Sequence, residues 1–392
     1  MPQQMDDLVA AVTKAQPRTA VVLCNGSPVA MPWVGGAPAV LEMYLAGQAS
    51  GSAMADLIFG TATPSGKLAE TFPLAAADCA SHPYFMSHPS QLIYREGLNL
   101  GYRYFQTFHK PVLFPFGHGL SYTTFAYSNL QLSSSALDVL QLATDSLHLS
   151  VDVTNTGERH GREVVQVYVR DLEASVHRPS LELRDFAKTA PLAPGEVVRL
   201  SFCLPSRAFA FYDVAASDWY VEPGTFEVHI GASVVDLRLS ARVEVSGEPR
   251  ATVGGAAVPR YETLADDQLA SLGLQLPPPP PPRPLHRTSL VKDVGQHGGC
   301  FGRFFYALLL KGNGSVSDPG EQRSREEMLK AMPLQQLMRF AHCNSVAARY
   351  VFTERVLGCL ISGFNCSGRS PRAAAHTTLA VSPQKGSPFS DV

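Results

Sequence analysis

Apolar and polar residues alternate repeatedly between positions 129 and 247, and this pattern constrains the fold more than any other feature. The alternation is clearest in residues 147–154 and 165–170. Similar runs follow at 197–204, 208–212, 219–221, 225–230 and 235–245. Because successive side chains of a β-strand point to opposite faces of a sheet, such runs predict strands with one buried face. Strands of this length at short spacing predict an all-β sandwich over residues 127–247.

The first 60 residues show a different spacing of apolar residues. Apolar side chains recur at helical spacing in residues 5–16, and short apolar runs at 19–24 and 39–45 are typical of buried parallel strands. A further helix is predicted at 47–59, so the order indicates an α/β layer. Two strands make a small sheet, and we expect residues 1–126 to be part of an α/β domain that exposes a long strand edge and an apolar face.

A segment rich in aromatic residues and glycine, residues 92–130, joins these two regions and is called the aromatic joint below. The sequence Phe-Pro-Phe-Gly at 114–117 favours an extended path, because proline fixes its own φ and restricts the residue before it. Its aromatic rings can either glue the two regions together or stack on sugar rings. We expect the first, with most of these seven residues buried: Tyr102, Tyr104, Phe105, Phe114, Phe116, Tyr122 and Phe125.

The pattern loosens after residue 247. An unbroken proline run at 277–282 predicts an extended spacer, with a docking ligand for another protein as the alternative. Helices are predicted at 302–310 and at 325–340, the second interrupted by Pro333. We therefore interpret residues 248–366 as a Pro-rich spacer and helical extension, and residues 367–392 as a disordered tail.

Charge and composition argue against several classes of partner. The net charge is −2, and 16 basic groups against 10 acidic ones in residues 250–392 form no concentrated basic face. A nucleic-acid partner is therefore not expected, whereas docking of this basic part on the acidic residues 1–249 stays open. There is no run of about 18 apolar residues and no secretory signal, so no membrane association and, by default, a cytoplasmic location are expected. Seven scattered cysteines predict free thiols.

Few polar residues stand out as site candidates. Asp56 lies in a predicted apolar helix, where a packing or capping role explains it. Arg95 and Glu96 either pair with each other or face a sugar cleft, and we expect the pair. The histidines of the first region show no metal-ligand spacing: His82, His88, His109 and His118. We therefore assign no catalytic, cofactor-binding or metal-binding residue, and expect no cofactor.

Three ordered motifs carry a resemblance to a known family of enzymes. They are VVLCNGSPV with MPW at 21–33, PSGKL with TFP at 64–73, and EGLNLGYRYF followed by PFGHGLSYTTFAYSNL at 96–130. Together they resemble the C-terminal portion of glycoside hydrolase family 3, the β-glucosidase and β-xylosidase group. DVTNTGERHGREVVQVYV at 152–169 resembles the opening of that family's fibronectin type III-like domain, and EEMLKAMPLQQLMRF at 326–340 resembles its C-terminal extension. The resemblance covers residues 1 to about 247, with a weaker match beyond.

The resemblance implies a fold and a function. The implied fold class is an α/β partial sandwich domain with parallel strands, then an all-β fibronectin type III-like sandwich and a partly helical, partly disordered tail. Retaining glycosidases use two carboxyl groups about 5–5.5 Å apart. In the family the nucleophilic Asp lies on an N-terminal barrel and the acid/base usually upstream of the VVLCNGSPV strand, so neither maps onto a residue here.

These implications lead to one leading hypothesis and one alternative. We expect a portion of a β-glucosidase-like glycoside hydrolase that is inactive alone, with a β-linked glucoside or xyloside as its ligand. A barrel-containing chain or a second copy of this chain is the expected kind of protein partner. The alternative is a non-catalytic glycan-binding or assembly module that complements a separate barrel chain.

Overall fold

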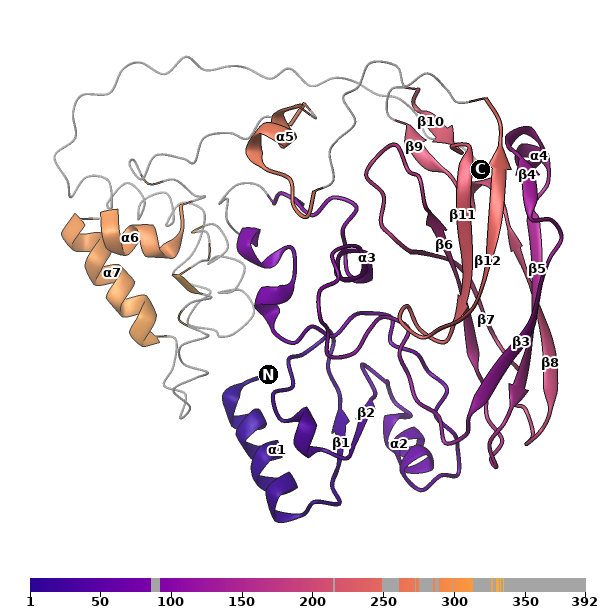
Figure 1. The fold of residues 1–392 in the computed structure, drawn as a ribbon. Coiled ribbons are helices and arrows are strands. Elements are labelled where there is room, and N and C mark those ends of the chain that lie inside the picture. The colour runs from indigo at the N-terminus through magenta and orange to yellow at the C-terminus, as the bar shows by residue number, and fades with distance from the viewer. Residues whose placement is uncertain are drawn as a thin grey trace, which may run out of the picture. The chain divides into compact units, whose positions relative to one another are not determined.

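The computed structural model divides into two compact units, residues 1–278 and residues 279–392. The first unit contains an α/β part, the aromatic joint and a β-sandwich (Figure 1). Secondary structure is described for residues 1–85, 92–213, 216–248, 261–271, 273–274, 285, 289–297, 299–312, 326, 329–330, 332 and 334.

The α/β part places two helices around a small parallel sheet. Its regular elements are α1 (Gln3–Ala15), β1 (Ala20–Leu23), the 3-10 helix η1 (Val34–Gly36), β2 (Ala39–Glu42) and α2 (Ser50–Ile58). The predicted order of helix, strand, strand and helix is confirmed, and β1 pairs with β2 in parallel with Leu23 opposite Glu42. A small apolar cluster holds this part together: Leu23, Met31, Trp33 and Phe72.

Much of the apolar side of this part is exposed. Met5, Leu8 and Val12 of α1 are 55%, 63% and 43% exposed, and Leu45 and Phe59 are 82% and 83% exposed. Parallel sheets normally have both faces covered, so the expected apolar face is confirmed. The strand edge is shorter than expected, because β1 and β2 are four residues each.

The aromatic joint is more regular than its composition predicts. Two short 3-10 helices, η2 (Ala76–Asp78) and η3 (His82–Tyr84), precede it, and it contains helix α3 (Tyr102–Thr107). Of the seven aromatic residues, three are buried, three are half-buried, and Tyr122 is 45% exposed. The expectation of burial is therefore confirmed for Tyr104, Phe105 and Phe125, and only partly met for the three half-buried rings. It is wrong for Tyr122, whose hydroxyl donates to the Leu57 carbonyl at 2.7 Å.

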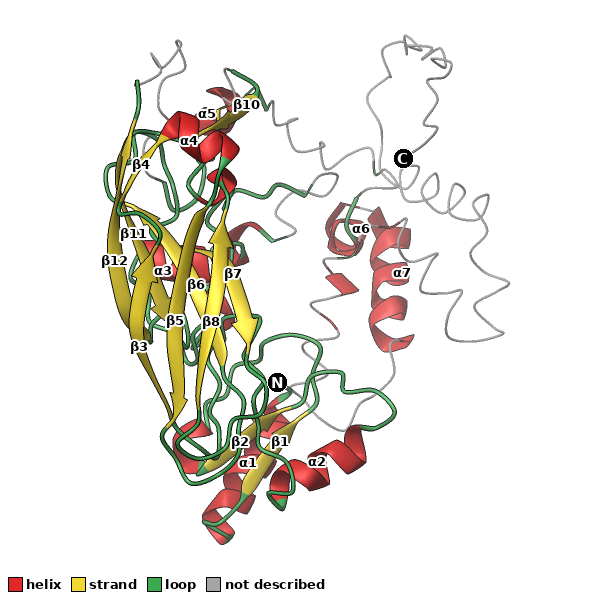
Figure 2. Ribbon diagram, turned by 90° about the vertical axis from the view of Figure 1, so that its right-hand side faces the viewer, coloured by secondary structure: helices red, strands yellow, loops and turns green. Residues whose placement is uncertain are grey.

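The β-sandwich consists of a five-stranded and a three-stranded sheet, which Figure 2 shows as two long layers. The first has the order β4-β12-β11-β6-β7, the second β3-β5-β8, and β9 and β10 form a hairpin. The bounds are β3 (Phe125–Leu132), β4 (Ala136–Asp138), α4 (Val139–Thr144), β5 (Leu147–Asn155), β6 (Val164–Asp171), β7 (Glu182–Lys188), β8 (Val197–Leu204), η4 (Ser206–Ala208), β9 (Phe211–Asp213), β10 (Asp218–Tyr220), β11 (Gly224–Gly231) and β12 (Leu237–Ser246).

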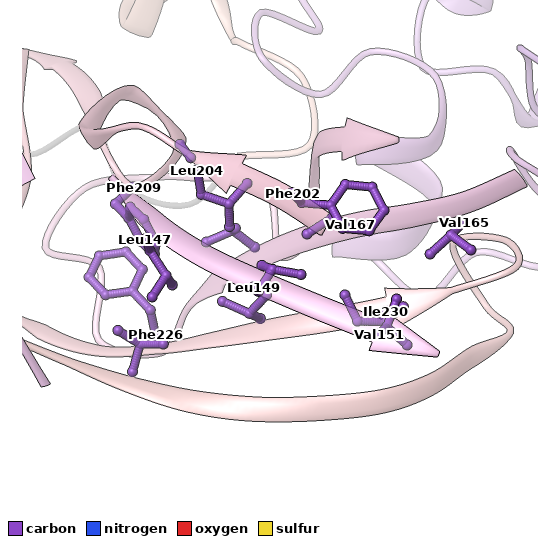
Figure 3. Packing of buried hydrophobic residues seen from close by; sticks show 14 of the residues in the cluster. Leu147, Leu149, Val151, Val165, Val167, Phe202, Leu204, Phe209, Phe226 and Ile230 are labelled. Atoms are coloured by element: carbon purple, nitrogen blue, oxygen red, sulfur yellow. The ribbon is translucent and has the colours of Figure 1, made fainter. Parts of the chain in front are cut away.

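The core of the sandwich follows directly from the alternating pattern. Every second residue of β5, from Leu147 to Asn155, is buried. Leu149 and Val151 of β5 belong to one cluster with Phe226 and Ile230 of β11 (Figure 3). Burial of these side chains from both sheets is the main force that holds the layers together.

Three helices follow the sandwich in the part of the segment that the structure describes. In the first unit, α5 (Asp266–Ser271) follows a stretch that contacts the aromatic joint. The second unit contains α6 (Val291–His297) and α7 (Gly299–Gly312), the latter enclosing the helix predicted at 302–310. Within it, Leu285, Val291 and Val294 form a buried cluster with Leu329, Met332 and Leu334. The proline run at 277–282, most of the helix predicted at 325–340 and the tail at 367–392 lie outside the described residues.

None of the described helices is long and apolar enough to cross a lipid bilayer.

Candidate functional site

A cavity of about 520 Å³ opens where the α/β part meets the aromatic joint, and we call it the joint cavity. Three short stretches of chain line it, together with three single residues: residues 69–71, 79–81 and 99–105, with Pro28, Glu96 and Phe116. A volume of this size lies in the range of small-molecule sites.

One wall of the joint cavity is aromatic. The rings of Tyr102 and Phe116 stack with their centroids 4.5 Å apart, and Tyr102 also meets the buried Tyr168 of β6 edge-on. The Leu183 N–H of β7 donates to the Tyr102 hydroxyl at 2.9 Å. The sandwich therefore fixes the position of this wall, as the glue interpretation of the joint requires.

Several polar groups face the same space. Thr71 is 9% exposed, and its hydroxyl has no hydrogen-bond partner among the described residues. The Nε of Arg103 is also unpaired within that part of the chain, although its Nη2 lies 3.2 Å from Glu182 Oε1. A buried polar group without a partner is costly, and both atoms are almost fully shielded from solvent in residues that line the cavity.

The segment 261–266 closes one side of the joint. Asn99, fully buried, donates from Nδ2 to the Tyr261 carbonyl at 2.7 Å and lies 2.9 Å from His177 Nε2 through its Oδ1. Lys110 lies 3.1 Å from Glu262. These contacts attach the chain that follows the sandwich to the wall of the cavity.

The expected pair between Arg95 and Glu96 is wrong. Arg95 instead forms an ion pair with Asp266 and donates to the Leu264 carbonyl at 2.9 Å. The Leu264 N–H in turn donates to the Arg95 carbonyl, so this residue is held toward the 261–266 segment. Glu96, only 4% exposed, lines the joint cavity. Arg95 thus contacts the 261–266 segment, whereas its neighbour Glu96 lines the cavity.

The other candidates have ordinary surroundings. Asp56 is exposed on α2, so the structure shows neither packing nor capping for its carboxylate. His118 stacks on Phe114 at 5.3 Å, and burial lowers its pKa, with the charge of Lys67 acting in the same direction. His82 and His109 are exposed, and His88 lies outside the described residues.

No group of three metal-binding side chains occurs in the described part of the chain. Three cysteines are free thiols: Cys24, Cys79 and Cys203.

Two of the sequence motifs, PSGKL at 64–68 and PFGHG at 115–119, contact each other in the structure. The Leu68 N–H donates to the His118 carbonyl, and the Gly117 N–H donates to the Leu68 carbonyl, both at 2.8 Å. Gly119 lies so close to the Gly66 carbonyl that a Cβ would clash with it. Lys67 forms an ion pair with Glu163 of the sandwich at 3.0 Å. The PSGKL and PFGHG motifs are thus the structural link between the α/β part and the sandwich.

Sequence reasoning missed the polar residues of the joint cavity. Thr71, Asn99 and Arg103 all lie inside motifs that carry the family resemblance, and this was their only signal. The segments that bring them together are separated by 28 to 32 positions of chain, and no local pattern predicts that contact.

Two parts of this chain match known protein domain families. Residues 1–122 match the glycosyl hydrolase family 3 C-terminal domain, and residues 163–234 match a fibronectin type III-like domain. The chain is 45% identical over 247 residues to thermostable beta-glucosidase B of Acetivibrio thermocellus, covering 63% of this chain and 32% of that protein.

Solved structures agree with the sequence match. The β-glucosidase DesR of Streptomyces venezuelae has a TM-score of 0.57 and 38% identity, covering 62% of this chain and 31% of that one. A family 3 β-glucosidase of Bifidobacterium adolescentis has a TM-score of 0.58 and 38% identity, covering 69% and 38%. The chain thus spans about a third of the length of these relatives. Its residues 1–122 therefore correspond to the glycosyl hydrolase family 3 C-terminal domain, and its residues 163–234 correspond to a fibronectin type III-like domain.

Proposed function

We propose that this chain serves the hydrolysis of β-linked glucosides as the C-terminal portion of a β-glucosidase-like enzyme. The match of residues 1–122 and 163–234 to the two family domains supports this most strongly. The named relatives that share these regions are β-glucosidases. A β-linked glucoside or xyloside is therefore the substrate class that fits best.

The contribution of the chain is a supporting one. Retaining hydrolysis needs a nucleophile and an acid/base about 5–5.5 Å apart, and no carboxylate of this sequence takes either role through the family motifs. The joint cavity instead offers an aromatic wall at Tyr102 and Phe116 and polar groups at Thr71 and Arg103. Such a surface holds a sugar or shapes the wall beside a reacting one, while a barrel supplies the reacting carboxylates.

An assay of the purified 392-residue polypeptide tests this division of roles. With aryl β-glucosides and aryl β-xylosides, we expect turnover no faster than in buffer. Turnover well above that background, removed by a single change such as Glu96→Gln, would place a catalytic carboxylate in this chain and overturn the proposal.

A second candidate function is that of an assembly module, and one observation favours it. The apolar side of α1 is exposed at Met5, Leu8 and Val12, and exposed apolar patches of this kind mark protein interfaces. Light scattering after gel filtration tests this surface. We expect Met5→Ser with Leu8→Ser to abolish self-association or capture of a barrel-containing polypeptide, whereas Leu140→Ser, 80% exposed on the sandwich, leaves both unchanged.

A further inference from the structure

Three polar side chains gather at one edge of the small parallel sheet. Asn25 lies two residues after the end of β1, Glu42 is the last residue of β2, and Tyr44 lies two residues after Glu42. The register places Leu23 opposite Glu42, so the carboxyl ends of both strands lie at the same edge. In open α/β sheets this edge is where ligands bind.

Each of these side chains has a buried oxygen without a partner. By hydrogen-bond geometry, Asn25 Oδ1, Glu42 Oε2 and the Tyr44 hydroxyl are buried and have no partner within the described residues. The Asn25 side chain nevertheless lies close enough to Glu42 to lower the pKa of its carboxyl group. Their other polar atoms are fixed: Asn25 Nδ2 donates to the Ser27 carbonyl and the Tyr44 N–H donates to Glu42 Oε1, both at 2.7 Å. Because unpaired buried polar groups are costly, three of them at one sheet edge point to a ligand that would pair with them.

The backbone at this edge is also strained. Tyr44 has a φ of 46°, in the left-handed region that bulky residues rarely adopt. Strain of this kind persists where the surrounding structure imposes it, and it gathers at ligand sites. Glu42 lies near enough for its charge to raise the pKa of the Tyr44 hydroxyl.

The electrostatics of this edge favour hydrogen-bond donors. Burial raises the pKa of Glu42, whereas hydrogen bonds from the Tyr44 N–H and the Asn25 side chain act in the opposite direction, and the nearby Glu70 carboxylate adds to the rise. Burial, Glu42 and Glu70 together raise the pKa of Tyr44 to about 12, so its hydroxyl keeps its proton at neutral pH. Glu70 also lines the joint cavity. Glu42 and Tyr44 are thus close to a residue of the candidate site, and the three side chains present mainly oxygen acceptors.

We propose that Asn25, Glu42 and Tyr44 bind neighbouring hydroxyl groups of the sugar, so that the strand ends form a polyol-recognition site next to the joint cavity. The carboxylate and amide oxygens of Glu42 and Asn25 accept from two sugar hydroxyls, and the Tyr44 hydroxyl donates to a sugar oxygen. This inference rests on the proposed function, since it names how a β-glucoside is held by this chain.

Ligand-observed NMR titration with methyl β-D-glucopyranoside tests the site without any catalysis. We expect the wild-type polypeptide to bind in the millimolar range, with affinity about fivefold weaker in Tyr44→Phe and about tenfold weaker in Glu42→Gln, as for loss of a neutral and a charged hydrogen bond. The matched control is Tyr122→Phe, which removes a hydroxyl that is bonded to Leu57 instead. It should bind as the wild type does.

The thermal midpoint provides the second readout. Tyr44→Phe removes a hydroxyl that has no partner among the described residues, so we expect it to melt at the wild-type temperature. Equal sugar affinity in all four proteins, or no binding by the wild type at 100 mM sugar (roughly the limit of such weak sites), overturns the proposal. A third outcome is that the chain does not bind the sugar, whereas a barrel-containing polypeptide binds the chain only when Glu42 is intact. In that case a basic side chain of the partner occupies the sheet edge. That outcome overturns the inference and leaves the proposed function standing.

Discussion

Lys67 and Glu163 show how single residues connect the two parts of the first unit. Their side chains are 13% and 6% exposed, and Lys67 also donates to the Gly119 carbonyl at 3.0 Å. A buried ion pair contributes little net stability, but removing one partner leaves an unpaired buried charge. The lysine of the PSGKL motif can therefore be buried at this position because Glu163 of the sandwich supplies a carboxylate.

Glu163→Gln should therefore destabilise the protein by about 3–5 kcal/mol. Urea denaturation measures this change, and the double variant with Lys67→Met should recover part of the loss because it removes both charges. A single-variant effect within 0.5 kcal/mol (roughly that of a surface substitution) would contradict the role of this pair.

His229 of β11 provides a prediction about pH. Burial lowers its pKa, although Glu227, with a carboxylate oxygen 3.3 Å from Nε2, acts in the opposite direction. Between the folded pKa and the ordinary value of 6.5, the unfolded chain binds more protons than the folded one, so stability is lost as pH falls through this window. His229→Gln should flatten the stability profile between pH 7 and pH 5. An unchanged slope would show that other groups carry it.

At the scale of elements, the alternating strands were predictable and the irregular ones were not. β5 and β8 follow their predicted runs because one face of each is packed on the core. β7 was not predicted, since it lies at the sheet edge and its sequence ELRDFAK shows no buried face. Helix α3 was not predicted, because the aromatic residues there indicated an extended chain.

The aromatic joint yields a prediction about an element. Phe116 is half-buried and stacked on Tyr102, so Phe116→Ala should cost about 2–3 kcal/mol, less than for a fully buried ring. Thermal unfolding measures this, with Phe186→Ala as the control because Phe186 is 63% exposed on β7. An unchanged midpoint together with weaker sugar binding would show that the ring is a ligand wall and not an adhesive contact.

At the scale of the whole molecule, the resemblance of residues 1–247 to glycoside hydrolase family 3 could be recognised from the sequence, but the site could not. Ordered motifs specify the family because they describe close packing, as Gly119 against Gly66 shows. The joint cavity and the strand-end residues Asn25, Glu42 and Tyr44 depend on contacts between distant segments and on unpaired atoms. Periodicity and composition contain no information about either.

The two parts of the first unit bury their apolar residues to different degrees, so they should differ in local stability. Residues 1–120 hold a two-stranded sheet and an exposed apolar face, whereas residues 129–247 enclose a continuous core. In hydrogen exchange, amides of β1 and β2 should therefore exchange faster than those of β5 and β11. Equal protection of the two regions would mean that the α/β part needs no further partner.

The central claim is that this chain supports β-glucoside hydrolysis without supplying the reacting carboxylates. The most direct test is a chimera in which residues 1–247 replace the matching region of thermostable beta-glucosidase B of Acetivibrio thermocellus, to which this chain is 45% identical over 247 residues. The account predicts that the 392-residue polypeptide alone leaves an aryl β-glucoside intact and that the chimera hydrolyses it. Hydrolysis by the polypeptide alone, or a folded chimera without activity, would contradict the account.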